Sequence, residues 1–99
     1  MELPILVDKE KITQFCQQWH ITKLAFFGSI LTERFSDDSD VDVLFEYDPD
    51  HVPTLFDVAM MERELSEILG RKADMRTPED LSRFFREEVI RNAVVQYAA

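Results

Sequence analysis

Apolar and polar residues alternate along this chain with two different periods, which predict helices and strands. Over residues 55–69, apolar side chains recur about every 3.6 positions and charged side chains fall largely on the other side, as in an amphipathic helix. Over residues 41–47, every second residue is apolar, which is typical of a strand with one buried face. The interpretation of the rest of the chain starts from these two segments.

Shorter patterns predict the other elements. We expect a helix over 8–19, a strand over 22–27, a short helix from 29, a strand over 71–76 and helical residues over 78–97. The 99 residues suffice for one domain, and 45% of them are hydrophobic, so a core can form. The sequence therefore predicts a single α/β domain over residues 1–99, with a small mixed β-sheet and flanking helices.

The first predicted strand ends abruptly at Gly28, which indicates a turn. Ser29 is a favoured N-cap residue, so we expect the turn to begin the short helix. Backbone N–H groups at such a corner point outward and attract phosphate oxygens. Gly28 and Ser29 are therefore candidate phosphate-binding residues.

Three aspartates are candidate metal ligands. Asp40 and Asp42 stand at the start of the alternating strand, on the face opposite its apolar positions, with Cα atoms about 6.5–7 Å apart. Two carboxylates at that spacing can converge on a hard cation such as Mg²⁺. Asp74 lies near the middle of the strand predicted over 71–76. If that strand lies beside the first, at about 4.8 Å, the three carboxylates can form one cluster.

These residues form a recognisable motif, in which Gly-Ser is followed by ten residues, then Asp-Val-Asp, then a later aspartate. The chain resembles the minimal nucleotidyltransferases of the DNA polymerase beta-like superfamily over nearly its whole length. Its closing segment, 84–97, also looks like their last helix. The resemblance implies roles for the motif residues: triphosphate binding for Gly28 and Ser29, and magnesium binding and catalysis for Asp40, Asp42 and Asp74.

The resemblance also implies a substrate and a partner. Stand-alone members of this family often act as antitoxins that pair with a HEPN ribonuclease toxin, and characterised members transfer AMP from ATP onto a toxin tyrosine. We therefore expect an ATP-dependent protein adenylyltransferase in a hetero-oligomer with such a toxin. The alternative is a non-catalytic antitoxin that acts by binding and occlusion. Neither of the two histidines lies in the Arg-x4–6-His arrangement of a HEPN ribonuclease, so the toxin must be a different polypeptide.

One position departs from the family pattern. Many members carry an arginine three residues after the serine, whereas this chain has Thr32 there and its nearest basic residue is Arg34. Arg34 is therefore a further candidate nucleotide-binding residue. Three possibilities stay open: Arg34 contacts the triphosphate from another angle, a partner protein contributes a cation, or nucleotide binding and activity are weak.

Charge narrows the choice of partner. Acidic residues outnumber Lys and Arg by 20 to 11, which gives a net charge of −9 and disfavours nucleic acid as the main partner. A basic protein fits better, and the acid concentrated over residues 33–50 can steer it toward the candidate site.

Other features concern location and the single cysteine. The N-terminus lacks a basic region followed by a long apolar run, and no stretch approaches 18 apolar residues, so we expect a cytoplasmic protein that does not span or bind a membrane. Cys16 is solitary and is expected to pack as a small hydrophobe.

Overall fold

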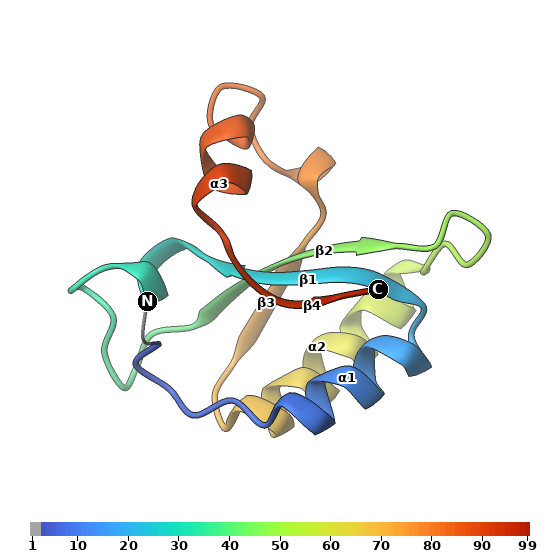
Figure 1. Cartoon of the computed structure of the whole chain (residues 1–99), viewed down its shortest axis with the longest axis horizontal. Helices are drawn as coiled ribbons and strands as arrows, with labels where there is room; N and C mark the ends of the chain where they lie inside the picture. Colours follow the sequence, from blue (N-terminus) through green and yellow to red (C-terminus); the bar gives the residue numbers. More distant parts are fainter. Residues whose placement is uncertain (1–2) are drawn as a thin grey trace.

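The computed structural model describes residues 3–99 as four strands with helices before, between and after them (Figure 1). The elements, in chain order, are α1 (Lys9–Gln18), β1 (Ile21–Phe27), the 3-10 turn η1 (Gly28–Leu31), β2 (Val41–Tyr47), α2 (Leu55–Leu69), β3 (Ala73–Arg76), the 3-10 turn η2 (Pro78–Asp80), α3 (Arg86–Asn92) and β4 (Val94–Ala98).

The four strands form one mixed sheet in the order β3-β2-β1-β4. β2 pairs with β3 in parallel, whereas β1 pairs with β2 and with β4 antiparallel. Helices α1 and α2 lie together on one side of the sheet, and α3 stands on the other side (Figure 1). The predicted fold class, a small mixed sheet with flanking helices, is confirmed.

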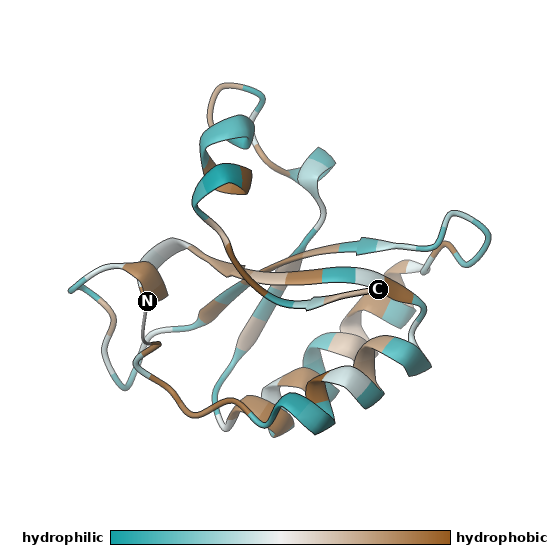
Figure 2. Ribbon diagram, viewed as in Figure 1, coloured by the Kyte–Doolittle hydropathy of each residue, from teal (hydrophilic) through white to brown (hydrophobic). Residues whose placement is uncertain are grey.

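The main core lies between the sheet and helices α1 and α2. Apolar residues alternate with hydrophilic ones along both helices (Figure 2), and the apolar side chains that face the sheet are buried. Alternate residues of β2 from Val41 to Phe45 are also buried, as the pattern predicted. Cys16 is fully buried in this core, and burial raises the pKa of its thiol to about 12, so the thiol stays protonated and packs as a hydrophobe.

Helix α2 has the predicted bounds because both of its ends are marked in the sequence. At its start, the Thr54 hydroxyl accepts a hydrogen bond from the Asp57 N–H at 3.1 Å, and the Asp57 carboxylate accepts one from the Thr54 N–H at 2.8 Å. At its end, Gly70 adopts a left-handed conformation with φ of 72°. The helix is thereby fixed in length, which sets where β3 begins.

The prediction of helical residues over 78–97 is wrong at its end. Helix α3 spans only Arg86–Asn92, and the residues from Val94 onward form β4, with Leu24 of β1 opposite Tyr97. A strand forms there because β1 offers an unpaired edge and Val94 and Val95 are β-branched, so tertiary pairing overrides the helical pattern. The strand predicted over 71–76 is correct but begins two residues later, at Ala73.

A single side chain ties the start of α3 to the preceding turn. The Arg86 guanidinium donates hydrogen bonds to the carbonyls of Pro78 at 2.7 Å and Leu81 at 3.1 Å. These bonds link the start of α3 to the turn η2, and so they help to hold α3 over the sheet face opposite α1 and α2. Across residues 3–99, no helix is both long enough and apolar enough to cross a bilayer.

Candidate active site

The Gly-Ser turn lies directly against Asp42, the second aspartate of the Asp-Val-Asp motif. Gly28 has φ of 77°, and a Cβ atom at this position would lie 2.3 Å from Oδ2 of Asp42. Both the left-handed backbone and the adjacent carboxylate therefore require glycine. The Ser29 backbone N–H lies near the same carboxylate and acts to lower its pKa. The two halves of the sequence motif thus meet at Asp42.

Ser29 does not have the role of helix cap that we predicted for it. The turn η1 begins one residue earlier, at Gly28, and Phe27 occupies its N-cap position without a side-chain bond. Gly28, at a left-handed φ, begins the turn, so Ser29 lies inside it. Thr32 closes the turn, since its hydroxyl donates to the Ser29 carbonyl at 2.9 Å.

Asp42 and Asp74 lie side by side on neighbouring strands. The parallel register of β2 and β3 places the two residues directly opposite each other. On each strand the flanking residues, such as Val43 and Met75, are buried against α1 and α2, so the carboxylates point to the opposite face. That is the face on which α3 stands (Figure 1).

The surroundings of Asp42 disfavour its charged form. Burial raises the pKa of the Asp42 carboxyl most, and the nearby charges of Asp74 and Asp40 raise it further. The positive charge of Arg76 and the nearby Ser29 backbone N–H oppose that rise without cancelling it. Asp42 is therefore the carboxylate at which the negative potential of the site concentrates.

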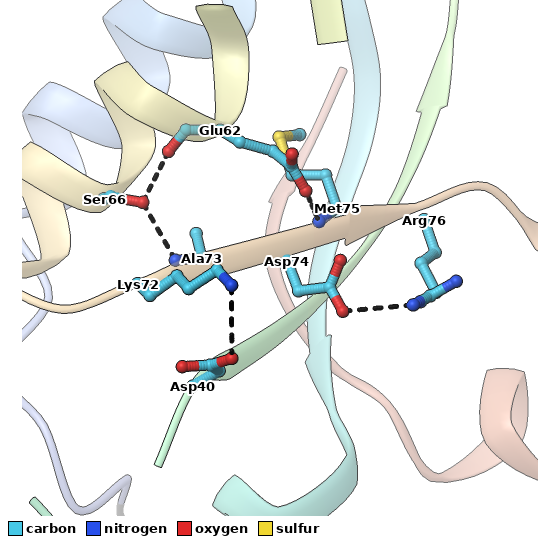
Figure 3. A network of polar contacts seen from close by, with 8 residues as sticks. All are labelled: Asp40, Glu62, Ser66, Lys72, Ala73, Asp74, Met75 and Arg76. Carbon is cyan, nitrogen blue, oxygen red and sulfur yellow. Dashed lines mark hydrogen bonds and ion pairs between the residues drawn. The ribbon is translucent and has the colours of Figure 1, made fainter. Parts of the chain in front are cut away.

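Two basic residues that our sequence reasoning missed accompany the other aspartates (Figure 3). Nη2 of Arg76 lies 3.2 Å from Oδ2 of Asp74, and Nζ of Lys72 lies 3.9 Å from Oδ2 of Asp40. A signal for them was present, because residues 72, 74 and 76 alternate and so share one face of a strand. The Lys72 pair is largely exposed and contributes little stability.

Helix α2 fixes the strand that carries Asp74 (Figure 3). The Glu62 carboxylate accepts a hydrogen bond from the Met75 N–H at 2.7 Å. The Ser66 hydroxyl accepts one from the Ala73 N–H at 2.9 Å and donates to the Glu62 carbonyl at 2.5 Å. The backbone donors on either side of Asp74 are thus held by side chains, which positions its carboxylate relative to Asp42.

The carboxylates have the chemistry that Mg²⁺ requires. They are hard oxygen ligands, and the mutual repulsion that raises the pKa of Asp42 is relieved when a cation lies among them. Among residues 3–99, no three His, Cys, Asp or Glu side chains are already arranged to hold a metal. Asp40 instead lies beside Lys72, and Asp74 beside Arg76.

A cleft of about 770 Å³ opens beside the Gly-Ser turn. Phe27 and Leu31 supply apolar wall on the turn side, and Phe85 and Val89 supply it on the side of α3. Gly28 and three polar residues, Thr32, Glu88 and Asn92, complete the lining. The volume and the mixture of apolar wall with few polar groups are typical of small-ligand sites. Sequence reasoning did not place α3 in the site.

The Arg34 side chain forms no ion pair with the three carboxylates. It is exposed on the loop after η1, and its backbone N–H donates to the Thr32 hydroxyl at 3.2 Å. Within residues 3–99, its side chain takes part in no hydrogen bond or ion pair. Its role in nucleotide binding stays a prediction.

Comparison with known proteins shows which family the chain belongs to. The family model for the nucleotidyltransferase domain matches residues 9–97. The chain belongs to the nucleotidyltransferase domain family. In this nucleotidyltransferase the match extends from α1 to β4, so it includes both the Gly-Ser turn and the carboxylates of β2 and β3.

Individual relatives share most of their length with this nucleotidyltransferase. A candidate protein adenylyltransferase of Methanocaldococcus jannaschii is 26% identical over 86 residues, which cover 87% of this chain and 90% of that relative. A solved structure described as a candidate minimal nucleotidyltransferase has a TM-score of 0.71 and 28% identity, and the match covers 87% and 86% of the two chains.

A more distant structural relative is a toxin-antitoxin complex crystallised with AMP-PNP. The TM-score is 0.73 at 14% identity, with coverage of 94% of this nucleotidyltransferase and 75% of that chain. At this identity, the likeness shows the shared fold alone.

Proposed function

We propose that this nucleotidyltransferase is an antitoxin that transfers AMP from ATP to a tyrosine hydroxyl of a HEPN ribonuclease toxin. The observation that carries the proposal is the position of Asp42, which lies between the Gly-Ser turn and Asp74. That arrangement brings the Gly-Ser turn, which in this proposal binds the phosphates, close to the paired carboxylates. The candidate adenylyltransferase relative supports protein as the acceptor, and the toxin-antitoxin complex with AMP-PNP supports a toxin partner and a nucleotide.

In this proposal the nucleotide lies along the turn and in the adjoining cleft. The triphosphate meets the backbone at Gly28 and Ser29, and Arg34 supplies a positive charge from the loop that follows. The nucleoside occupies the cleft between Phe27 and Phe85, where apolar wall excludes water from one side of it. The α-phosphorus then lies next to Asp42.

The chain's own carboxylates handle the proton and orient the attack. A tyrosine hydroxyl, with a pKa near 10, must lose its proton as its oxygen bonds to the α-phosphorus. Asp74 accepts that proton and passes it to solvent, while the bond from the α-phosphorus to the bridging oxygen breaks and pyrophosphate leaves. Asp40, Asp42 and Asp74 would hold Mg²⁺, which would neutralise charge on the phosphates. Arg76 keeps the Asp74 carboxylate in place before the nucleotide arrives.

A second candidate function is inhibition by binding alone. Two observations favour it: Asp40 and Asp74 each lie beside a cation of the same chain, and Thr32 replaces the arginine that many family members carry. A protein of this kind would bind its toxin equally well with or without the catalytic carboxylates. The two functions therefore differ in one measurable property, the covalent change of the partner.

Intact-mass spectrometry distinguishes the two functions. The protein encoded beside this one is incubated with ATP, Mg²⁺ and either wild-type chain or the Asp40→Asn/Asp42→Asn variant. The matched control is Asp37→Asn/Asp38→Asn, which makes the same charge change at exposed positions of the same loop. We expect a mass gain of one or more adenylates with wild type and control only. No gain with wild type, despite a tight complex, would leave inhibition by binding.

A further inference from the structure

Helix α2 has a second apolar face that the core does not use. Its core face consists of Met61, Leu65 and Leu69, all buried. Four large apolar residues lie on another side, at the start of the helix and just before it, and are exposed by 55–89%. We call this surface the outer face of α2; it consists of Val52, Leu55, Phe56 and Met60.

The outer face is confined to one part of the helix. Phe56 and Met60 are four residues apart and share one side of the helix, Leu55 lies next to Phe56 in the first turn, and Val52 lies in the loop just before it. Beyond Met60 the exposed positions are polar, as Arg63 and Glu67 show. A solvent-facing helix surface is normally polar, and a contiguous exposed apolar patch marks a site of interaction.

A hollow of about 440 Å³ lies beside the outer face and reaches a residue that contacts the candidate active site. Pro53 and Leu55 line it together with Arg76 and Thr77. Arg76 in turn donates a hydrogen bond to Asp74 at 3.2 Å. The carboxylates lie on the other face of the sheet, so a partner seated on the outer face would reach Asp74 around the β3 edge, past Arg76.

The charge around the outer face restricts its occupant. Residues 48–60 contain three aspartates and neither lysine nor arginine. An anionic membrane or a nucleic acid is repelled by such a surface. A second copy of this chain, joined through the same face by a two-fold axis, would bring two acidic rims together. A protein with apolar side chains flanked by Lys and Arg has the complementary surface.

We propose that the outer face of α2 docks the protein that accepts AMP, through an apolar anchor with a basic rim. The proposal rests on the proposed function for the identity of the acceptor as a protein. Docking is separate from chemistry, because Leu55 and Phe56 take no part in the Asp42 site. The face therefore sets the affinity for the partner and leaves the rate of transfer within the complex unchanged.

Binding and transfer measurements on the protein encoded beside this one test the proposal. The test variant is Leu55→Ser/Phe56→Ser, in which two side chains exposed by 89% and 84% are replaced at the start of the helix, where serine is tolerated. The matched control is Leu6→Ser/Phe84→Ser, at positions exposed by 96% and 79% outside the face. Circular dichroism melts establish that all the variants fold.

We expect the test variant to raise the Kd for that protein, and the KM for it as acceptor, at least about tenfold with kcat retained. The control variant should stay within about twofold of wild type. Asp50→Lys should slow association severalfold at low salt and little at high salt. A test variant that binds as tightly as wild type would overturn the proposal, as would a wild-type chain that does not bind.

Two further outcomes separate this proposal from the proposed function. If wild type binds without transferring AMP, the proposed function fails, but a tenfold rise in Kd for the test variant still supports the docking face. If wild type transfers AMP and the test variant has the same KM, the docking face is wrong and the function stands. Sedimentation showing that the test variant abolishes self-association would overturn the proposal in favour of a second copy.

Discussion

The two walls of the candidate site are built in different ways. The wall that carries Asp42 and Asp74 consists of paired strands, and side chains of α2 hold the backbone of β3 from outside. The opposite wall is α3, a helix without a single buried residue, which one arginine links to the preceding turn. The first wall holds the groups that need fixed geometry, and the second offers apolar surface to a ligand. Substitutions in the two walls should therefore affect different kinetic constants.

The strongest test of the strand wall is the removal of its central charge. We expect Asp42→Asn to lower the rate of AMP transfer at least about a hundredfold, because the carboxylate lies between the turn and Asp74. The Kd for the partner protein should not change. The measurement is the adenylation rate at saturating ATP, with Asp38→Asn as the control. Wild-type activity in the Asp42→Asn protein would contradict the assignment of this wall to chemistry.

Gly28→Ala should disrupt the strand wall by a steric clash rather than by a change of charge. The new Cβ would lie 2.3 Å from the Asp42 carboxylate at a left-handed φ, so we expect a loss of about 2–4 kcal/mol of stability and a lower transfer rate. Gly70→Ala is the matched control, because Gly70 has φ of 72° but no atom within 4 Å of the added Cβ. Its cost should be only about 1–2 kcal/mol, with activity retained. Urea unfolding of both variants tests the difference.

Substitutions in the helix wall should change the affinity for the nucleotide. Phe85→Ala removes apolar surface from the cleft and should raise the KM for ATP about tenfold, with little change in kcat or melting temperature, since the side chain is 62% exposed. Phe84 is exposed by 79% and is not part of the cleft lining, so Phe84→Ala provides the control. If both substitutions raise the KM for ATP equally, the cleft is not the nucleotide site.

The smallest expected effect is that of Asp42→Asn on the melting temperature of the metal-free protein. Because the pKa of Asp42 is raised, the folded state binds its proton more tightly than the unfolded state, so ionised Asp42 lowers stability at neutral pH. Asp42→Asn should therefore raise the melting temperature slightly at pH 7 without Mg²⁺. This gain should shrink as the pH falls toward the ordinary range of an aspartate carboxyl. A variant that melts below wild type at pH 7 would contradict the pKa shift.

The difference between the strand wall and the helix wall also explains which parts of the structure could be predicted from the sequence. Strand β2 and helix α2 were predicted with their bounds because each has a clear period, and because Thr54 and Gly70 mark the ends of the helix. The contact of Gly28 with Asp42 follows from the same motif. The Gly-Ser spacing and the aspartates were enough to predict which residues form the strand wall. The position of Asp74 beside Asp42 depended in addition on the register of β2 and β3.

The helix wall could not be predicted in the same way. The segment after Arg86 has residues that suit a helix, but the free edge of β1 draws the last of them into β4. The position of α3 over the sheet depends on the Arg86 bonds to the Pro78 and Leu81 carbonyls, which no local pattern indicates. Lys72 and Arg76 were predictable from strand alternation once β3 was recognised.

The bonds from Glu62 and Ser66 to β3 have a consequence for assembly. β3 is a terminal strand of the sheet, and such a strand normally presents free backbone donors on which another polypeptide can template a further strand. Here the N–H groups of Ala73 and Met75 are already occupied by side chains. An incoming extended peptide would first have to break both bonds, at a cost of about 1 kcal/mol each. The two side chains that fix Asp74 thus also protect this margin of the sheet from amyloid-like growth.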